Sequence, residues 1–381
     1  MNDSREMLLK LFTQASFPYH PAHSVRDLLG NKKIFAYGGG DGFITFSVFV
    51  LRKYGLEAYA VLDRKFKCGD THLGVPAFSP LEYTPTAEEK ADAVVVVTVG
   101  KKEYHKEIFN CLRGLGFKNV ILATEIYEYH LLHTPKELEA QGWDYYLNNQ
   151  NRIMACFDLW TDDLSREIFF RVIQTHMHKM PIRIPDCALE DQYFPKDINL
   201  KKGYSRFVNC GAYNGDTVMR LNTLSGKVDA VACFEPDPYN FELLTRYLCA
   251  HHHEMAHEVV AFPCGVFSHE MQLHFAGGDK INSMISETGE SIIQCVSLDR
   301  AIPGFKPTFI SMDVEGVELE ALQGAEMLVK ENKPDLGICV YHAPNHIWDI
   351  PLYLADLHLG YRFFLRNYTS FISETVLYAT T

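Results

Sequence analysis

Residues 206–217 read Arg-Phe-Val-Asn-Cys-Gly-Ala-Tyr-Asn-Gly-Asp-Thr, and residues 230–238 read Ala-Val-Ala-Cys-Phe-Glu-Pro-Asp-Pro. The first stretch is an apolar run that ends in a turn with two glycines, Gly211 and Gly215, before a polar helix start. The second stretch is another apolar run, and it ends at the acid Glu235. A strand, a tight turn, a helix and a second strand tipped with a carboxylate form the unit by which Rossmann-like sheets bind adenosine-containing cofactors.

The residues of the turn indicate which cofactor is bound. A dinucleotide site uses a Gly-x-Gly-x-x-Gly turn that directs the N-terminus of a helix at a pyrophosphate. Here Asp216 follows the last glycine, where it would repel a phosphate. S-adenosylmethionine has no phosphate and carries a sulfonium and an ammonium, so we expect it as the cofactor. The alternative is an ordinary turn whose glycines serve packing alone.

We expect the cofactor to contact the glycine turn and the tips of three strands. Asn209 and the turn would lie under the methionine part, Glu235 would accept hydrogen bonds from the ribose hydroxyls, and Cys264 would lie beside the adenine. A plain turn at residues 264–266 is the alternative for the adenine contact. The predicted cofactor-binding residues are Asn209, Gly211, Ala212, Tyr213, Gly215, Asp216, Glu235, Pro236, Asp237, Cys264 and Gly265.

A second strand, acidic turn and helix occupy residues 310–325, and they place Asp313 and Glu315 where this architecture carries out its chemistry. His342 follows a further apolar run, 338–341, and an ordinary histidine pKa near 6.5 suits a general base. We therefore predict Asp313, His342 and Glu315 as catalytic residues. A structural role is the alternative for each, with Glu315 bonded to the helix start. We expect Glu318 and Glu320 on the surface of that helix.

These segments resemble the FkbM-type methyltransferase family. The pattern Asp-Val-Glu-Gly-x-Glu-x-x-x-Leu-x-Gly-Ala is present from Asp313 to Ala325, in the right order after residues 209–216 and 234–238 and before residues 341–345. The resemblance covers about 190 to 381 and implies an O-methyl acceptor in a sugar, a glycolipid or a secondary metabolite. One departure is that Asn209 stands where the family often has an acid.

The composition narrows the class of protein. The chain has 381 residues, a formal net charge of −12 and ten cysteines without a Cys-x-x-Cys pair. The negative charge argues against nucleic acid as a partner, and the lack of a long apolar run argues against membrane insertion. The cysteines are typical of reduced, buried thiols, so we expect a cytoplasmic protein. The expected partner is a small-molecule or carbohydrate acceptor, and a homo-oligomer is left open.

The first half predicts a smaller parallel sheet. Residues 33–37, 58–63, 91–99 and 119–123 are the expected strands, with helices over 43–54 and 101–115. Parts of this half resemble the Rossmann-like N-terminal domain of sugar acetyltransferases from surface-polysaccharide pathways, on residues 34–40, 74–80 and 115–120. The Gly38–Gly42 turn and Asp63 repeat the cofactor pattern, either without a ligand or for a nucleotide or sugar nucleotide.

The expected fold class is α/β, with two Rossmann-like domains. We predict a small Rossmann-like domain over 1–130, a helical connector over 131–200 and an S-adenosylmethionine-dependent methyltransferase domain over 201–381. The last is a class I methyltransferase sheet with one reversed strand at its end, in a terminal antiparallel hairpin. An inserted hairpin spans 271–300. The seven strands are expected to begin near Arg206, Ala230, Glu258, Thr308, Leu336, Tyr361 and Thr375.

We predict no metal, because Asp313 and Glu315 have no clear third oxygen ligand. The histidines at 251–253 and 257 lack cysteine or carboxylate partners at zinc-like spacing, so a solvated helix end is expected there. Three other functions stay open. They are methylation of an amine, a non-catalytic binding protein with a degenerate cofactor site, and a nicotinamide enzyme that uses the first domain.

Overall fold

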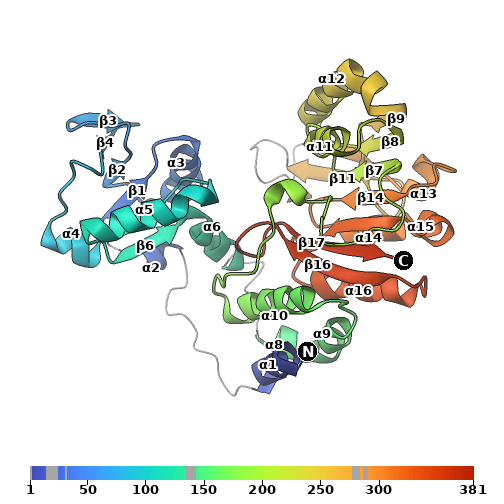
Figure 1. The fold of residues 1–381 in the computed structure, drawn as a ribbon, viewed down its shortest axis with the longest axis horizontal. Helices are drawn as coiled ribbons and strands as arrows, with labels where there is room; N and C mark the ends of the chain where they lie inside the picture. The colour runs from blue at the N-terminus through green and yellow to red at the C-terminus, as the bar shows by residue number, and fades with distance from the viewer. Residues whose placement is uncertain (1, 14–24, 31, 134–142, 277–283, 286–290) are drawn as a thin grey trace. The chain divides into compact units, whose positions relative to one another are not determined.

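The computed structural model describes residues 2–13, 25–30, 32–133, 143–276, 284–285 and 291–381. The chain divides into two compact units: unit 1 holds residues 1–14, 147–174 and 182–381, and unit 2 holds residues 15–146 and 175–181. Each unit has its own main sheet, with the elements labelled in Figure 1. The functional division at residues 130 and 200 remains a prediction.

Unit 2 is a six-stranded sheet in the order β3-β4-β2-β1-β5-β6. All of its neighbouring strands pair in parallel except β3, which is antiparallel to β4. The strands are β1 (Ile34–Tyr37), β2 (Ala60–Leu62), β3 (Asp70–His72), β4 (Val75–Phe78), β5 (Val94–Val97) and β6 (Asn119–Leu122). The helices are α2 (Val25–Leu29), α3 (Asp41–Phe46), the π-helical η1 (Ser47–Arg52), α4 (Ala87–Asp92), α5 (Lys102–Leu115) and α6 (Ala123–Leu132).

The four strands predicted for this half are present, and α5 ends at Gly116 in the left-handed conformation, as a C-terminal glycine predicts. The hairpin of β3 and β4 was missed, because its strands are short and β4 contains Pro76. The helix expected over 43–54 is present, but it begins at Asp41 and is π-helical over Ser47–Arg52.

Unit 1 is built on a seven-stranded sheet in the order β16-β17-β15-β14-β7-β8-β9. Only β17 runs against the others, because it pairs antiparallel with both β15 and β16. The strands are β7 (Arg206–Cys210), β8 (Val228–Phe234), β9 (Ala256–Phe262), β14 (Phe309–Met312), β15 (Asp335–Cys339), β16 (Arg362–Asn367) and β17 (Thr375–Thr380). The expected α/β class and methyltransferase sheet are therefore confirmed.

All seven strands begin within two residues of the predicted positions, and the terminal hairpin of β16 and β17 is confirmed. The reversed strand is β17, the last strand in the chain, and it lies between β15 and β16. Pairing with β15 lets β17 bury every residue on both faces. The order of the strands along the sequence does not determine which strands β17 pairs with.

The other strands of unit 1 form a four-stranded sheet, β10-β13-β11-β12. Its main pair is antiparallel, as the hairpin expected over 271–300 predicts. These strands are β10 (Gly265–Val266), β11 (Met271–Ala276), β12 (Met284–Ile285) and β13 (Ser291–Val296).

The helices of unit 1 are α1 (Asn2–Thr13), α9 (Gln150–Phe157), the 3₁₀ turn η2 (Leu189–Asp191), α11 (Asp216–Ser225), α12 (Pro238–Met255), α13 (Leu298–Ala301), α14 (Glu318–Gln323), α15 (Glu326–Asn332) and α16 (His346–Asp356). Two further helices, α8 (Trp143–Asn148) and α10 (Asp163–His178), contribute residues to both units.

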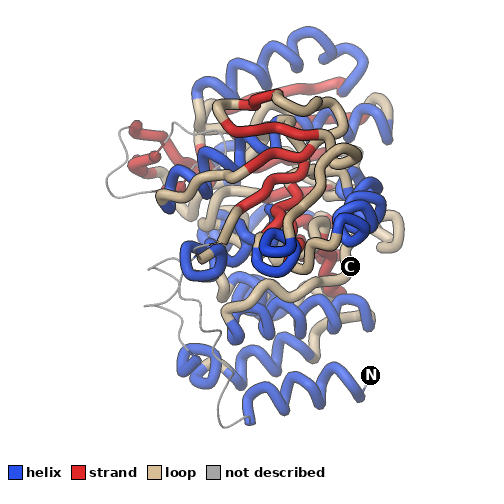
Figure 2. The backbone as a smooth tube through the Cα atoms, turned by 90° about the vertical axis from the view of Figure 1, so that its left-hand side faces the viewer, coloured by secondary structure: helices blue, strands red, loops and turns tan. Residues whose placement is uncertain are grey.

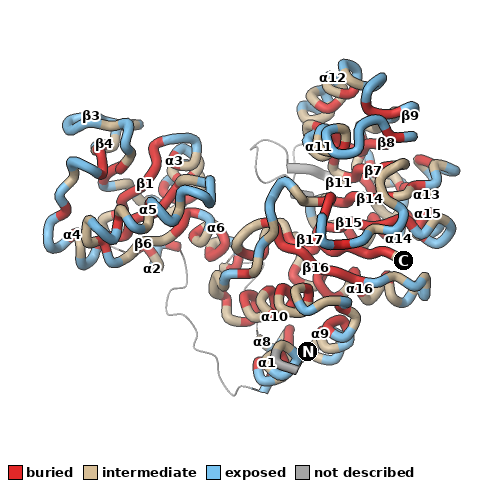
Figure 3. The backbone as a smooth tube through the Cα atoms, viewed as in Figure 1, coloured by how far each residue is buried: buried red, intermediate tan, exposed pale blue. Residues whose placement is uncertain are grey.

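The central strands of unit 1 are buried on both faces, as covered parallel strands require. Figure 2 shows strands lying between helices, and Figure 3 shows β7, β14 and β15 largely in the colour of buried residues. Because the strands are covered on both faces, their exposed polar ends are where side chains can meet a ligand. Within the described residues, no helix has both the length and the apolarity of a membrane span.

Candidate active site

The loop between β7 and α11 is held against the ends of two neighbouring strands. Gly211 has a φ of +78°, and a Cβ there would lie 1.8 Å from the carbonyl oxygen of Asp313, so only glycine fits. The N–H groups of Gly211 and Ala212 donate to the carbonyl oxygen of Phe234 at 3.0 and 2.9 Å. Gly215, with a φ of +92°, ends the loop as the N-cap of α11. The sequence pattern of the turn therefore has a steric cause.

Glu235 lies at the tip of β8 and faces this loop. Its Oε2 accepts the N–H of Tyr213 at 2.7 Å, and its Oε1 accepts the N–H of Asp237 at 2.8 Å. The residue is 6% exposed, and burial raises the pKa of its carboxyl to about 7, although both N–H donors favour the ionised form. Each oxygen keeps a free lone pair, so the carboxylate can still accept hydrogen bonds from a diol.

Asn209 is a buried amide with one unpaired end. Its Oδ1 accepts a hydrogen bond from the hydroxyl of Ser311 at 3.0 Å, while its Nδ2 has no partner among the described residues. A buried donor without a partner is costly and needs an acceptor. As placed, the amide offers a donor, which suits a carboxylate of a ligand.

The remaining predicted cofactor residues surround the same loop. Ala212 is fully buried, Tyr213 is 44% exposed with a φ of +48°, and Asp216 is exposed and bonded to its own helix start. A Cβ on Gly265 would lie 3.9 Å from the Cβ of Pro236, so the start of β10 is close to the tip of β8. Cys264 is buried beside it, and Asp237 caps α12 through the N–H of Asn240.

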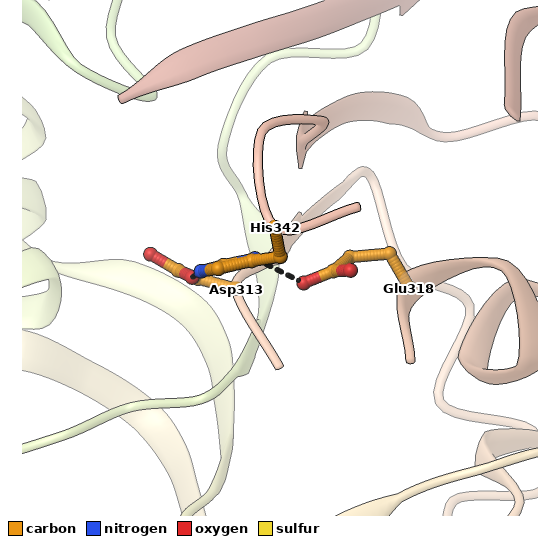
Figure 4. A group of neighbouring side chains, drawn as sticks. All are labelled: Asp313, Glu318 and His342. Atoms are coloured by element: carbon orange, nitrogen blue, oxygen red, sulfur yellow. Dashed lines mark hydrogen bonds and ion pairs between the residues drawn. The ribbon is translucent and has the colours of Figure 1, made fainter. Parts of the chain in front are cut away.

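Two of the predicted catalytic residues, Asp313 and His342, lie side by side with Glu318 next to the same imidazole ring (Figure 4). Nε2 of His342 lies 3.4 Å from Oδ1 of Asp313 and 3.6 Å from Oε2 of Glu315. Nδ1 of the same ring lies 2.8 Å from Oε1 of Glu318. Asp313 follows β14 and His342 follows β15, so parallel strands bring the two side chains to one edge of the sheet.

The pKa values of His342, Asp313 and Glu315 all differ from those of the free side chains. Burial lowers the pKa of His342, but attraction by Glu318, Asp313 and Glu315 outweighs it and raises the pKa to about 10. Burial raises the pKa of Asp313, and it raises that of Glu315 to about 7, although Glu315 keeps 45% of its side chain exposed. In this arrangement His342 is a cation at neutral pH, and the ordinary pKa that we expected for a general base was wrong.

Glu318 was misplaced by the sequence analysis. We expected it on a helix surface, yet its side chain is fully buried. Its Oε1 accepts the N–H groups of Val314 and Gly316 at 3.1 and 3.3 Å, in addition to Nδ1 of His342. Burial alone would raise the pKa of Glu318, but the charge and hydrogen bond of His342, together with those of His346, outweigh it and hold this pKa well below its usual range. Glu318 therefore bonds the turn before α14, the contact that we had considered for Glu315.

Tyr193 is a site residue that was missed. Its hydroxyl donates to Oδ2 of Asp313 at 3.2 Å and lies 3.1 Å from Sγ of Cys339. The residue is buried, with a φ of +64°, and its N–H donates to the hydroxyl of Tyr378. Tyr193 and Asp313 are 120 residues apart in the sequence, so no local pattern indicates that they are in contact.

Glu374 adds a fourth carboxylate beside this group. It accepts from Nε2 of Gln192 at 2.7 Å and from the hydroxyl of Tyr341 at 3.4 Å. Burial raises its pKa, and repulsion from Asp313 acts in the same direction. Its position between β16 and β17 gave no signal in the sequence, because the hairpin turn reads as ordinary polar loop.

Residues 209–369 match the family model described as the methyltransferase FkbM domain. This segment is similar to the methyltransferase FkbM domain, and we refer to it below as the FkbM domain. Over 99% of both chains, the structure is similar to the crystal structure of methyltransferase FkbM from Methylobacillus flagellatus KT, with a TM-score of 0.71 and 21% identity. No curated protein matches the sequence significantly.

Two further solved structures match about half of the chain. One is an rRNA methylase from Streptococcus thermophilus, with 12% identity, a TM-score of 0.30 and coverage of 51% of this chain and 91% of that one. The other is fibrillarin from Aeropyrum pernix in complex with S-adenosyl-L-methionine, with 11% identity, a TM-score of 0.31 and coverage of 50% and 74%.

The FkbM domain contains every predicted site residue, from Asn209 to His342. Tyr193 and Glu374 lie just outside the matched range, although both contact this group of residues. The resemblance to the FkbM family that the sequence indicated is thus confirmed for residues 209–369. The resemblance of unit 2 to sugar acetyltransferases stays a prediction.

Outside the FkbM domain, the glycine turn of unit 2 is closed by its own residues. Oδ2 of Asp63 accepts the N–H of Gly39 at 2.8 Å, and Nζ of Lys65 donates to the Gly39 carbonyl at 2.7 Å. A Cβ on Gly39 would lie 2.7 Å from the ring of Phe66. Of the two interpretations left open for this turn, these contacts favour the one without a ligand.

The histidines of α12 do not gather around a common point. Nδ1 of His251 lies 3.0 Å from the carbonyl oxygen of Tyr247, and Nδ1 of His252 lies 3.1 Å from that of Cys249. His252 and His253 are exposed at the helix end. Among the described residues, the group with ligand atoms close enough for a metal is instead Asp313, Glu318 and His342.

Proposed function

We propose that this protein is an S-adenosylmethionine-dependent methyltransferase that methylates a hydroxyl group on a sugar, a glycan precursor or a secondary metabolite. The FkbM domain and the seven-stranded sheet with one reversed strand support the methyltransferase class. The hydroxyl acceptor rests on the family resemblance. The carbohydrate class rests on the resemblance of unit 2 to the N-terminal domain of sugar acetyltransferases.

The observation that carries the proposal is the contact between the glycine loop and Glu235. The loop donates the N–H of Tyr213 to this carboxylate and leaves both of its oxygens a free lone pair. Because two strand tips and the loop converge there, the residues fit an adenosine ribose whose two hydroxyls need an acceptor. A loop directed away from Glu235 would have removed this support.

The residues that would hold the rest of the cofactor also fit it. The buried Nδ2 of Asn209 lacks a partner and would donate to the carboxylate of the methionine part. Gly211 and Gly215 let the backbone approach, and Cys264 with Gly265 would line the adenine side. Bound S-adenosylmethionine supplies an electrophilic methyl group on a positively charged sulfur.

The carboxylates at the ends of β14 and β15 would prepare the acceptor. A methyl transfer is an in-line displacement, so the acceptor oxygen must be positioned and must lose its proton. We assign proton acceptance or orientation of the acceptor to Asp313, with Glu315 beside it. His342 holds both carboxylates in place through Nε2.

Labelled methyl transfer tests this assignment. The full chain is incubated with S-adenosylmethionine carrying a ¹³C methyl group and with a panel of sugar nucleotides, glycosides and phenolic metabolites. The proposal predicts a product with the label on oxygen, visible by NMR and mass spectrometry. Absence of transfer together with absence of S-adenosylhomocysteine binding would favour the non-catalytic alternative.

An amine acceptor is the second candidate, and one observation favours it. The carboxylates of Asp313, Glu315 and Glu318 lie around the imidazolium of His342, and Glu374 adds a further carboxylate that interacts with Asp313. Such an excess of negative charge would attract a cationic acceptor. Label on nitrogen in the same experiment would establish this candidate in place of the hydroxyl acceptor.

A further inference from the structure

The carboxylate of Glu318 joins three separate segments of unit 1. Its side chain is fully buried. Oε1 accepts the N–H groups of Val314 and Gly316 at 3.1 and 3.3 Å, in the turn between β14 and α14. Nδ1 of His342, after β15, lies 2.8 Å from the same oxygen, and Nδ1 of His346, at the start of α16, lies 3.0 Å from Oε2. One side chain therefore connects the ends of two neighbouring strands with the helix that follows them.

Packing alone does not explain a charge at this position. A buried carboxylate costs free energy unless it is paired, and a well-packed apolar residue often replaces a buried ion pair without loss of stability. The neighbouring buried positions of α14, Ala321 and Leu322, are apolar. What Glu318 adds to the fold is therefore a fixed geometry of the groups that it binds.

The imidazole of His342 lies between the carboxylates of Glu318 and Asp313 (Figure 4). Because an ionised carboxylate can only accept a hydrogen bond, Nδ1 carries a proton toward Glu318. Nε2 faces the other way, and it lies 3.4 Å from Oδ1 of Asp313. His342 is a cation at neutral pH, so Nε2 also carries a proton and attracts this carboxylate. The contact with Glu318 thus sets the direction in which the ring presents its positive charge.

Asp313 is held at its second oxygen as well. Oδ2 accepts a hydrogen bond from the hydroxyl of Tyr193 at 3.2 Å, so each oxygen faces a protein donor. Asp313 keeps 30% of its side chain exposed, and its remaining lone pairs can accept from a ligand. The direction of those lone pairs depends on both donors. The donor at Oδ1 is the one whose position depends on Glu318.

We propose that Glu318 is a positioning residue for methyl transfer: it holds His342 in the orientation that directs the carboxylate of Asp313 at the acceptor. This role rests on the proposed function, in which Asp313 is assigned to the acceptor. Glu318 acts from the buried side of the ring and would touch neither the acceptor nor the cofactor. The buried carboxylate of a Ser-His-Asp triad has the same task, and there the matching amide lowers turnover although the geometry is kept.

The first test observes the ring and needs no methyl transfer. In NMR spectra of the chain with ¹⁵N-labelled histidine, the Nδ1 proton of His342 is identified as the signal that His342→Gln removes. Its bond to a buried carboxylate should shift this signal far downfield. Glu318→Gln should move the signal back, whereas Glu320→Gln, which changes a partly buried side chain on the same helix, should leave it in place. A signal that Glu318→Gln does not move would overturn the proposal.

The second test separates turnover from binding. With the acceptor identified by labelled methyl transfer, Glu318→Gln should lower kcat roughly 10²-fold, the effect that a small misplacement of a reacting group can have. KM for S-adenosylmethionine and the affinity for S-adenosylhomocysteine should stay unchanged, and Glu320→Gln should keep the wild-type kcat. A merely structural role of Glu318 would lower the midpoint of thermal unfolding and leave kcat at its wild-type value, which would overturn the proposal.

A double variant tests whether Glu318 acts through His342. If it does, Glu318→Gln combined with His342→Gln should have the kcat of His342→Gln alone, because the effects of residues that act as one unit do not add. Two effects that multiply independently would overturn the proposal.

His342→Gln alone decides the matter if Glu318→Gln does not fold. A lowered kcat with unchanged affinity for S-adenosylhomocysteine would support the proposal, and full turnover would overturn it. Absence of methyl transfer by the wild-type chain would overturn the proposed function and this role together. An unmoved Nδ1 signal in Glu318→Gln would overturn this role alone.

Discussion

The backbone N–H of Tyr213 donates to Oε2 of Glu235 at 2.7 Å, and this contact joins the glycine loop of the first strand to the tip of the second. The loop is thereby held on the carboxylate that we propose for the cofactor ribose. Removing the carboxylate should both free the loop and remove the acceptor for the ribose hydroxyls.

Glu235→Ala should weaken the binding of S-adenosylhomocysteine by about 1.5–3 kcal/mol, the usual contribution of hydrogen bonds to a charged group. Isothermal titration calorimetry measures the change. Glu258→Ala is the matched control, because Glu258 is an exposed glutamate on β9, the neighbouring strand. Equal affinities for wild type and Glu235→Ala would remove Glu235 from the site.

Stability should depend on pH through the same residue. The pKa of Glu235 is raised from 4.5 to about 7 in the folded chain, so the folded state holds a proton that the unfolded state has lost between these values. This contribution is fully present below pH 4.5 and is lost as the pH rises through 7. The midpoint of thermal unfolding of wild type should therefore fall relative to Glu235→Gln between pH 5 and 7.5. Parallel midpoints over that range would contradict the prediction.

Gly211→Ala should be among the most damaging small substitutions in unit 1. The new Cβ would meet the Asp313 carbonyl oxygen at 1.8 Å on a residue with a φ of +78°, so strain and clash together should cost about 3 kcal/mol or more. Gly304→Ala has a similar φ of +75° with no atom within 4 Å, and it should cost only about 1–2 kcal/mol. Denaturant unfolding of both variants tests the difference, which disappears if the loop can move away.

Asp313→Asn should reduce turnover by roughly 10²–10⁴-fold and leave the affinity for S-adenosylhomocysteine nearly unchanged, because the side chain is assigned to the acceptor. Tyr193→Phe removes only the hydroxyl that donates to Asp313 and should have a smaller effect on turnover. Steady-state rates with the acceptor identified by labelling, together with calorimetry, measure both. Full activity of Asp313→Asn would move the proton acceptor elsewhere.

The parts of this site that could be predicted are those encoded locally. Strand, glycine turn, helix and acid follow one another from Arg206 to Glu235, so the loop and its carboxylate were expected. Glu318 was not placed, because the left-handed conformations of Glu315 and Gly316 turn the chain so that Glu318 faces inward. Tyr193 and the inner position of β17 depend on contacts between distant segments, which periodicity and turn residues do not encode.

Calorimetry of the wild-type chain with S-adenosylhomocysteine and with NAD tests the central claim most directly. The account predicts that S-adenosylhomocysteine binds with one equivalent per chain and that NAD does not bind. Binding of NAD instead, or of neither compound at millimolar concentration, would contradict it.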